Sequence, residues 1–285
     1  MRTPQSSQPS RVTGDRDDES RPLLGALRRL SRLAFENGAA HEPRQAGSMT
    51  RTLQHDGNAE RHNLRFIEGY LRPGDTVLDI GANTGTFAIA AARMVGPPGR
   101  IDAFEPSPTM RSALIENVAG AKLKSVIVVH ALMAGATAGL GRFVDGTSRS
   151  GRRRPPLPGE LATRVIGIEQ VRLDQFIGKR RYALMRIDIA GGELNALRGT
   201  EAQLNQANPP ALLVSFDPTL ADFGATPEIL ADWLDDRGYE VAFYDGDRNL
   251  LEYPEAPWRH RRIVLAMARS ARNFVLRRLA DKTSA

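Results

Sequence analysis

Cysteine is absent from the 285-residue sequence. The absence excludes disulfides, thiolate metal ligands and a cysteine nucleophile. It agrees with a reducing compartment, so a cytoplasmic location is the default expectation. No cluster of metal-ligating residue types stands out along the chain either, and we predict no metal site.

Long apolar runs are also missing. Hydrophobic residues make up 41% of the chain, but no run of them is long enough to span a bilayer. The Arg28-Arg29 pair resembles part of a twin-arginine signal, but Arg32 interrupts the stretch after it, and neither an apolar segment nor a small-residue cleavage site appears. We therefore expect a soluble protein with no transmembrane segment.

The charge balance is basic, with a formal net charge of +6 and a pI of about 10.0. Such a charge attracts anionic partners, including nucleic acid, acidic lipid and phosphorylated substrates, without choosing among them. No interleaved aromatic residues, RNP-type motif or zinc finger accompany the basic residues, which argues against nucleic acid. The partner that we expect is a small molecule or a glycan, which could be anionic. The oligomeric state is not predicted.

The chain divides into three parts. We expect a polar, disordered tail and an amphipathic helix in residues 1–48, one α/β domain in residues 49–269, and a basic helix in residues 270–285. In the first part, Pro22–Phe35 places apolar residues on one helical face with arginines beside it. This helix either packs on the domain or makes weak contact with a membrane surface or a partner.

One stretch, Asp75–Pro106, has the order strand, glycine turn, helix, strand, acidic residue. Thr76–Ile80 is an apolar run typical of a strand that is buried on both faces. Thr84–Val95 is an alanine-rich helix whose N-terminal amides would face a bound ligand. A second strand, Ile101–Phe104, comes next. This order is typical of one half of a nucleotide-binding α/β sheet.

The glycine spacing in this stretch separates two classes of cofactor. Gly81 and Gly85 are separated by three residues, whereas the dinucleotide fingerprint requires G-x-G-x-x-G. Asp79 precedes them, where a carboxylate favours the amino group and sulfonium of S-adenosylmethionine and disfavours a pyrophosphate. Glu105 lies about 20 residues after the glycine turn, where a carboxylate can accept hydrogen bonds from both ribose hydroxyls. We therefore predict an S-adenosylmethionine site.

Three further residues complete the predicted cofactor-binding set. Asn83 lies between the two glycines, Pro106 comes directly after the ribose acid, and Ala131 ends the third expected strand. His130 lies beside the expected adenine pocket. We interpret it as a structural residue, because no second histidine lies near it in sequence.

Apolar runs along the rest of the domain predict the other strands and the helices that cover them. The expected strands are Lys124–Ala131, Leu184–Ile189, Ala211–Phe216, Tyr239–Tyr244 and Ile263–Met267, and the expected helices are Glu60–Leu71, Pro108–Val118, Gly191–Gln206 and Pro227–Leu234. Together with the first half-sheet they predict an α/β fold, with a mostly parallel, seven-stranded sheet and helices on both faces.

A basic loop interrupts this pattern. Leu140–Val144 and Arg164–Ile168 are expected to pair as a hairpin-like insertion around Asp145–Leu161, which contains SRSGRRRPPLPG. Arginine, glycine and proline dominate that run, so we expect a mobile basic loop at residues 145–162. Two interpretations stay open: a solvated surface loop, or a lid that recruits an anionic substrate.

Two acidic residues are candidates for catalysis. Asp188 lies at the carboxyl end of the fourth strand, which in a doubly wound sheet opens onto the same crevice as Gly81 and Glu105. Glu193 falls in the first turn of the next helix, where the helix dipole favours a carboxylate, so it is either a structural acid or a site acid. Methyl transfer from a sulfonium is an in-line displacement, in which Asp188 would position a hydroxyl acceptor or remove its proton.

Three segments of the chain have the order and approximate spacing found in one enzyme family. They are GDTVLDIGANTGTF with AFEPSP after it, VRLDQFI (Val171–Ile177) and MRIDIAGGELNALRG (Met185–Gly199). The combination resembles the FkbM family of S-adenosylmethionine-dependent methyltransferases, from about Glu60 to Met267. The resemblance implies a Rossmann-like class I methyltransferase fold with seven strands. It also implies, usually, O-methylation of a hydroxyl on a sugar, polyketide or lipid-like acceptor.

Two positions depart from the family's pattern on the acceptor side. Ala190 stands where the Asp-x-Glu-Gly-x-Glu pattern has its second acid, and the fifth strand ends in Ser215-Phe216-Asp217 where members often carry Glu. Asp217 could substitute in part for the missing acid. Two alternatives to a small-molecule O-methyltransferase stay open: a non-catalytic S-adenosylmethionine-binding module and, from the basic charge alone, an RNA methyltransferase.

Overall fold

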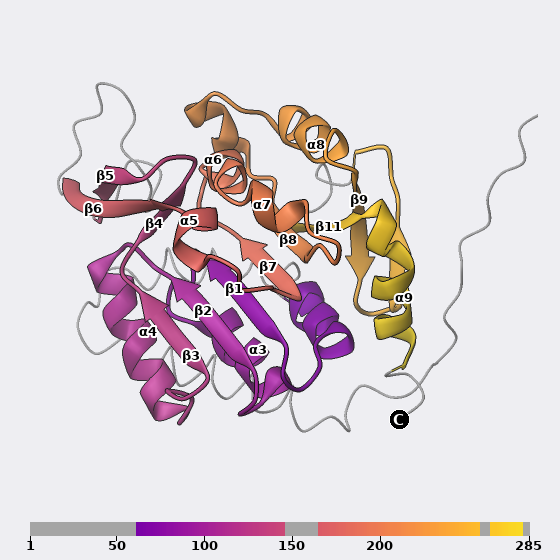
Figure 1. The fold of residues 1–285 in the computed structure, drawn as a ribbon, viewed down its shortest axis with the longest axis horizontal. Coiled ribbons are helices and arrows are strands. Elements are labelled where there is room, and N and C mark those ends of the chain that lie inside the picture. The colour runs from indigo at the N-terminus through magenta and orange to yellow at the C-terminus, as the bar shows by residue number, and fades with distance from the viewer. Residues whose placement is uncertain (1–60, 146–164, 257–262, 282–285) are drawn as a thin grey trace, which may run out of the picture.

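Three segments of the chain are described by the computed structural model: residues 61–145, 165–256 and 263–281 (Figure 1). The expected tail and amphipathic helix of residues 1–48 lie outside the described residues. So do all but the first residue of the expected basic loop at 145–162. Within the described segments, no helix has the length and apolar character needed to cross a membrane.

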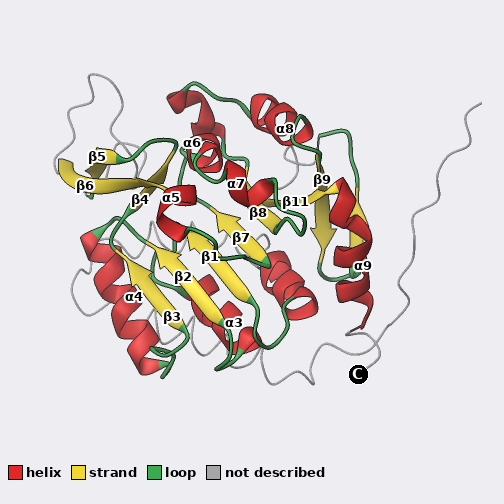
Figure 2. Cartoon of the chain, in the orientation of Figure 1, coloured by secondary structure: helices red, strands yellow, loops and turns green. Residues whose placement is uncertain are grey.

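An eight-stranded sheet forms the centre of the fold, in the order β10-β9-β11-β8-β7-β1-β2-β3 (Figure 2). Neighbours from β3 to β8 in this order are parallel, and neighbours from β8 to β10 are antiparallel. The strands are β1 (Thr76–Ile80), β2 (Arg100–Phe104), β3 (Ile127–His130), β7 (Leu184–Ile187), β8 (Ala211–Ser215), β9 (Tyr239–Asp245), β10 (Leu250–Glu252) and β11 (Ile263–Ala268). The predicted α/β class and mostly parallel sheet are confirmed.

The predicted number of strands is wrong by one, because this sheet has eight strands and not seven. The additional strand is β10, which pairs antiparallel with β9. In the turn between them, the carboxylate of Asp245 accepts hydrogen bonds from the amides of Asp247 and Arg248, and Asn249 takes a φ of 48°. A strand of only three residues shows no periodic pattern by which the sequence could reveal it.

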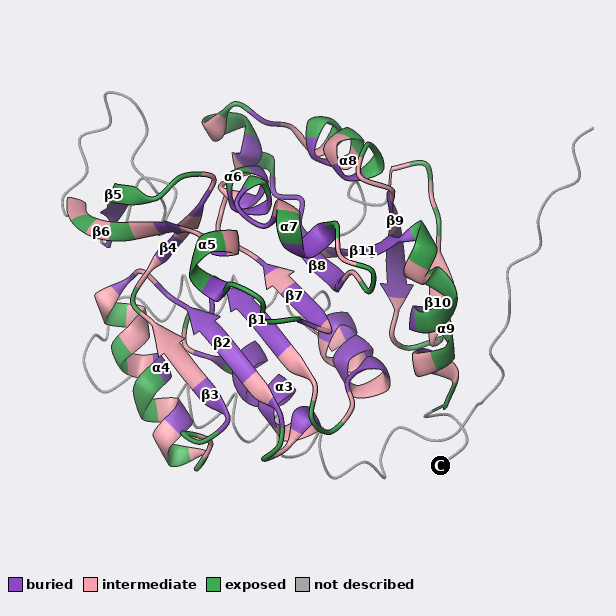
Figure 3. Cartoon of the chain, in the orientation of Figure 1, coloured by how far each residue is buried: buried purple, intermediate pink, exposed green. Residues whose placement is uncertain are grey.

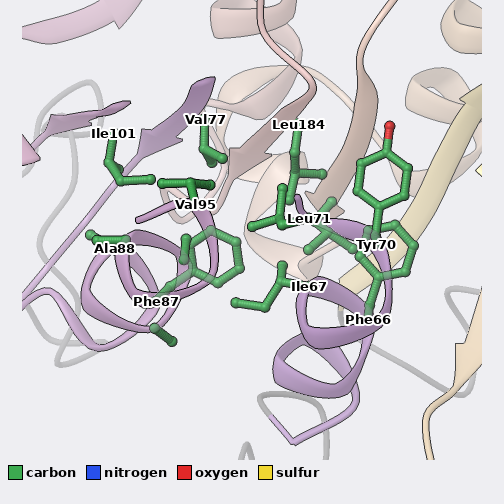
Figure 4. Packing of buried hydrophobic residues seen from close by; sticks show 14 of the residues in the cluster. Phe66, Ile67, Tyr70, Leu71, Val77, Phe87, Ala88, Val95, Ile101 and Leu184 are labelled. Carbon is green, nitrogen blue, oxygen red and sulfur yellow. The ribbon is translucent and has the colours of Figure 1, made fainter. Parts of the chain in front are cut away.

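Four helices cover one face of the sheet: the helix of residues 61–70, α3 (Thr86–Val95), α4 (Pro108–Gly120) and α9 (Arg272–Asp281). Most residues of the inner strands of the sheet are buried, as Figure 3 shows, because one core lies against each face. Figure 4 shows Phe87 and Val95 of α3 packed near the strand residues Val77 and Ile101. Because side chains alternate along a strand, Val77 joins this core while Leu78 joins the core on the opposite face.

The predicted basic helix near the C-terminus corresponds to α9 within the described residues. Val275 and Leu279 of this helix are buried in the same core as α3. Arg278 donates hydrogen bonds to both carboxylate oxygens of Asp75, in the loop before β1. The helix α9 is thus part of the layer that covers this face of the sheet.

Short helices cover the other face: α5 (Leu173–Ile177), α6 (Glu193–Arg198), α7 (Glu201–Leu204), the 3-10 helix η2 (Pro218–Phe223) and α8 (Pro227–Asp235). The single helix predicted for Gly191–Gln206 is wrong, since α6 and α7 are separated at Gly199-Thr200. A Cβ atom on Gly199 would lie 2.1 Å from the carbonyl oxygen of Gly135, so a neighbouring strand passes very close to the break. Local sequence periodicity does not report such a tertiary contact.

A separate three-stranded sheet, in the order β4-β6-β5, is inserted between β3 and β7. Its strands are β4 (Met133–Gly135), β5 (Gly139–Val144) and β6 (Val165–Arg172). β5 pairs antiparallel with β6 from Gly139↔Gln170 to Val144↔Val165, which confirms the predicted hairpin-like insertion. In Figure 1 this sheet extends away from the central sheet at the upper left.

Candidate functional site

The carboxyl ends of β1, β2 and β7 are joined by backbone hydrogen bonds. The amides of Gly81 and Ala82 both donate to the carbonyl oxygen of Phe104, at 2.9 and 3.0 Å. The amide of Asp188 donates to the carbonyl oxygen of Ile80 at 3.0 Å. The loops after the three strands therefore meet at one edge of the sheet, where ligands bind in doubly wound folds.

The glycine turn after β1 depends on backbone geometry that other residues cannot adopt there. Gly81 has a φ of +86°, and a Cβ atom on it would lie 2.2 Å from the carbonyl oxygen of Asp188. Gly85 has a φ of +92° and precedes α3, and its Cβ would lie 2.4 Å from Cδ1 of Leu114. Asn83, between them, is exposed and also has a positive φ, of 52°. The two glycines are thus required for the close approach of neighbouring elements as well as for the turn.

Glu105 ties the loop after β1 to the loop after β2. Its side-chain oxygens accept hydrogen bonds from the backbone amides of Asn83 and Ser107, both at 2.8 Å, and the residue is only 5% exposed. The carbonyl oxygen of Pro106 accepts a hydrogen bond from Arg111 at 2.9 Å. Ala131 is exposed and comes directly after β3. The amide of Glu105 donates to the carbonyl oxygen of His130 at 3.0 Å, so the loops after β1, β2 and β3 lie next to one another.

A guanidinium that is only 13% exposed, that of Arg186, joins two of the predicted acids. Nη1 of Arg186 lies 2.9 Å from Oδ1 of Asp79, and its Nη2 lies 2.7 Å from Oδ2 of Asp188. Asp79 is fully buried, and its second oxygen, Oδ2, has no hydrogen-bond partner among the described residues. Burial raises the pKa of Asp79, the charge of Arg186 opposes that rise, and the charge of Asp188 adds to it. Sequence reasoning missed Arg186, although an arginine inside an apolar strand was a visible signal.

Glu193 orders the loop between β7 and α6. It is fully buried, and its carboxylate accepts hydrogen bonds from the amides of Ile189 at 3.1 Å and Gly191 at 2.9 Å. These bonds hold a loop in which Ala190 has a φ of +53° and Gly191 a φ of +108°. Burial raises the pKa of Glu193 to about 7, although the backbone hydrogen bonds oppose the rise. Of the two alternatives for Glu193, this geometry corresponds to the structural one.

His130 and Asp217 also have structural partners. Nε2 of His130 lies 2.9 Å from Oδ1 of Asp102, and its ring stacks on Phe104 with the ring centres 4.6 Å apart. Asp217 precedes η2 and accepts hydrogen bonds from the amide and the hydroxyl of Thr219, at 2.9 and 2.7 Å. Both residues therefore stabilise local structure, which agrees with the interpretation of His130 and leaves the substitute role of Asp217 a prediction.

One group of possible metal ligands occurs in the described part of the chain, away from these loops. The ligand atoms of His62, Asp245 and Asp247 lie within 4.8 Å of one another. All three already have protein partners. Gly246 donates its amide to Nδ1 of His62, Arg61 pairs with Asp247, and Asp245 accepts the amides of Asp247 and Arg248. The expectation that the protein has no metal site stays a prediction.

The mostly parallel sheet with its antiparallel end corresponds to the class I methyltransferase fold that the sequence predicts, and the loops after β1, β2 and β7 meet at its carboxyl edge. A family model described as "Methyltransferase FkbM domain" matches residues 79–241, which is more than half of the chain. The chain therefore belongs to the FkbM methyltransferase family. The predicted family, enzyme class and cofactor, S-adenosylmethionine, are confirmed.

Individual relatives are more distant. The chain is 40% identical over 55 residues to a protein-L-isoaspartate O-methyltransferase of Triticum aestivum, a segment that is 19% of this chain and 24% of that protein. It is similar to the solved structure of an O-methyltransferase from Bacillus cereus in complex with SAH, with 11% identity, coverage of 86% and 91% of the two chains, and a TM-score of 0.46. Cofactor-bound Rv0187 from MTB has 17% identity, coverage of 89% and 91%, and a TM-score of 0.45.

Proposed function

We propose that this enzyme transfers a methyl group from S-adenosylmethionine to a hydroxyl of a small molecule, such as a sugar, a polyketide or a lipid-like acceptor. The observation that carries the proposal is the convergence of Asp79 on β1 with Glu105 and Asp188, on the loops after β2 and β7, at the carboxyl edge of the sheet. Two of these carboxylates suit the donor, and the third suits a hydroxyl acceptor. The domain limits of residues 49–269 and a cytoplasmic location belong to the same proposal.

The donor half of the site fits a cationic nucleoside. Glu105 is held by two backbone amides, so its carboxylate is fixed in place to receive the ribose hydroxyls. Oδ2 of Asp79, which has no hydrogen-bond partner among the described residues, is a buried acceptor that a cationic ligand can satisfy. The backbone around the ligand would come from the other predicted cofactor-binding residues: Gly81, Asn83, Gly85, Pro106 and Ala131.

On the acceptor half, Asp188 is the residue that we assign to the reacting hydroxyl. Bound S-adenosylmethionine would supply an electrophilic methyl group on its sulfonium. The carboxylate of Asp188 would accept a hydrogen bond from the acceptor hydroxyl. This bond would align the hydroxyl oxygen with the methyl carbon and the sulfur, from which the thioether product leaves. The hydroxyl proton then passes to this carboxylate or to solvent. Asp188 is well placed for orientation, because Arg186 fixes its side chain.

Titration calorimetry with S-adenosylmethionine tests the donor site. We expect Glu105→Ala to weaken binding by about tenfold or more, because charge-assisted hydrogen bonds to the ribose are lost. Glu116→Ala is the control, since Glu116 is an exposed acid on α4, and it should leave the affinity unchanged. Absence of binding to the unaltered protein, or equal binding by Glu105→Ala, would overturn the donor assignment.

Methyl transfer itself is tested with labelled S-adenosylmethionine and fractions of a cell extract. Once an acceptor is found, Asp188→Ala should abolish most of the transfer while donor binding persists. Transfer that survives this change unaltered would remove Asp188 from the mechanism. A product in which mass spectrometry and NMR locate the new methyl group on an oxygen of the acceptor would support O-methylation of a hydroxyl.

An RNA methyltransferase is the second candidate, and the net charge of +6 is the observation that favours it. Binding to RNA that weakens steeply with salt would support it, because phosphate contacts release counterions. A non-catalytic S-adenosylmethionine-binding module is the third, favoured by Ala190 in place of an acid. Donor binding without labelled transfer to any fraction would favour that alternative.

A further inference from the structure

Arg186 occupies the centre of the site, between the donor half and the acceptor half. It lies directly opposite Asp79 in the parallel pairing of β1 with β7, and Asp188 lies two positions later on the same side of the chain. One guanidinium nitrogen contacts Asp79 at 2.9 Å and the other contacts Asp188 at 2.7 Å. A single planar group therefore spans the two carboxylates.

The surroundings of Arg186 restrict its movement. Its side chain is only 13% exposed, and the guanidinium carbon lies 5.0 Å from the centre of the Phe87 ring on α3. Its Nη1 also lies 3.4 Å from the carbonyl oxygen of Gly81. The guanidinium thus contacts the glycine turn as well as both acids. A lysine would be a poor substitute, because an ammonium is a point charge without a fork of donors.

Charge balance gives the same residue a second role. Arg186 forms an ion pair with Asp79, which is fully buried, and another with Asp188, whose side chain is 17% exposed. Two carboxyl groups therefore share one cation. A buried carboxylate without a cation takes up a proton, since burial disfavours the charged form. A protonated Asp79 would attract a cationic donor less strongly.

We infer that Arg186 is a positioning residue that ties the donor carboxylate Asp79 to the acceptor-side carboxylate Asp188, so that the two halves of the site respond to one another. The inference rests on the proposed function of the site. Arg186 itself touches neither reacting group in this scheme. It acts through the two acids that it orients.

Calorimetry with S-adenosylmethionine on folded variants tests the inference. Arg186→Met should weaken binding by about tenfold or more, and Arg186→Lys should restore part of the loss. Binding to Arg186→Met should also strengthen as the pH rises, relative to the unaltered protein, because Asp79 must then lose a proton before it attracts the ligand. The charged groups that act on Asp79 in the structure are Arg186 and Asp188. The double variant Arg186→Met with Asp188→Asn therefore measures the contribution of the Asp188 charge to this pH dependence.

A double-mutant cycle measures the connection between the two halves. Asp188→Asn should change donor affinity about threefold or more when Arg186 is present. It should change the affinity less in the Arg186→Met background, where only the direct effect of the Asp188 charge on Asp79 remains. If Arg186→Met does not fold, the cycle runs in Arg186→Lys, where the effect of Asp188→Asn should be reduced.

The control is Arg278→Met, which removes a comparably buried arginine from a bidentate contact with Asp75. It should lower the melting temperature and leave donor affinity within about twofold, since no site carboxylate is involved. Additive effects of Asp188 and Arg186, or equal binding by Arg186→Met and the unaltered protein, would overturn the inference alone. Failure of the unaltered protein to bind S-adenosylmethionine would instead overturn the proposed function, and the inference with it.

Discussion

Ser107 donates its side-chain hydroxyl to the carboxylate of Asp145, which lies 38 positions later at the end of β5. The same serine donates its amide to Glu105 at 2.8 Å, and its hydroxyl oxygen accepts the amide of Met110 at 3.2 Å, which caps α4. The inserted sheet is therefore connected through one side chain to the carboxylate that we assign to the donor ribose.

Replacement of Ser107 by alanine should weaken donor binding as well as stability. The lost helix cap costs about 1 kcal/mol of unfolding free energy, and the loosened Glu105 loop should weaken S-adenosylmethionine binding severalfold. Thr226→Ala is the matched control, because Thr226 caps α8 in the same way at 3.2 Å but contacts no site residue in the described structure. Urea unfolding and calorimetry on both variants separate the two effects. Equal donor affinity in Ser107→Ala and Thr226→Ala would show that the contacts of Ser107 with Asp145 and Glu105 do not affect donor binding.

Gly81→Ala should destabilise the fold for two reasons: the positive φ at this position, and a clash of the new Cβ atom with the carbonyl oxygen of Asp188. The φ of +86° costs about 1 kcal/mol for any residue with a Cβ, and overpacking against the carbonyl oxygen of Asp188 adds roughly 1–3 kcal/mol. Gly74 has almost the same φ, +88°, but a Cβ atom on it would have no atom within 4 Å, so Gly74→Ala should cost only the first amount. Thermal or urea unfolding measures the loss of stability in Gly81→Ala and in Gly74→Ala. Equal losses in the two variants would show that no clash occurs at Gly81.

Glu193 should make stability fall as the pH rises across the mildly acidic range. Its pKa is raised from 4.5 to about 7, chiefly by burial, so the folded protein holds a proton that the unfolded chain releases. The contribution is fully present below 4.5 and is lost as the pH rises through about 7, which amounts to roughly 2 kcal/mol between about pH 5 and pH 8.

The variant Glu193→Gln isolates this effect, because it does not titrate. The difference in unfolding free energy between the unaltered protein and Glu193→Gln should shrink or change sign as the pH rises, while contributions from other groups cancel. Urea unfolding at about pH 5 and pH 8 measures it. A pH-independent difference would mean that Glu193 is ionised throughout and that its two backbone hydrogen bonds outweigh burial.

Most of the central sheet could be predicted from local patterns. Buried parallel strands are continuous apolar runs, and the glycine turn with Glu105 has a fixed spacing relative to them. The position of Asp188 at the same edge could be inferred from the geometry of a doubly wound sheet. These features depend on residues near one another in sequence, or on rules that hold for the whole fold class.

The interactions that were missed depend on tertiary register. The contact between Arg186 and Asp79 joins residues 107 positions apart and requires β1 to pair with β7 in one particular register. The break at Gly199 arises from a strand of the inserted sheet, and the loop-ordering role of Glu193 could not be separated from a site role by sequence. A local pattern contains no information about which of several apolar strands lies beside another.

Asp102 provides a test of structure that is independent of the donor site. It is almost fully buried on β2, and its carboxylate contacts Arg100, Arg180, His130 and Tyr182. Burial raises the pKa of Asp102, but the hydrogen bonds from His130 and Arg100 outweigh it, so the pKa is lowered and the carboxylate is charged. Asp102 is thus the shared acceptor of four donors.

Asp102→Asn should therefore destabilise the protein by roughly 1–3 kcal/mol, because Tyr182 and His130 lose a buried acceptor. The two arginines are each 38% exposed and can reach water instead. Arg100→Met removes only one of the four donors, from a side chain that is 38% exposed, and should cost about 1 kcal/mol or less. Urea unfolding compares the two variants. Since Asp102 lies on the α5 side of β2 and Asp79 on the α3 side of β1, Arg100→Met should retain donor affinity within about twofold. A loss of stability in Asp102→Asn no larger than that in Arg100→Met would mean that the other three donors find water in place of the carboxylate.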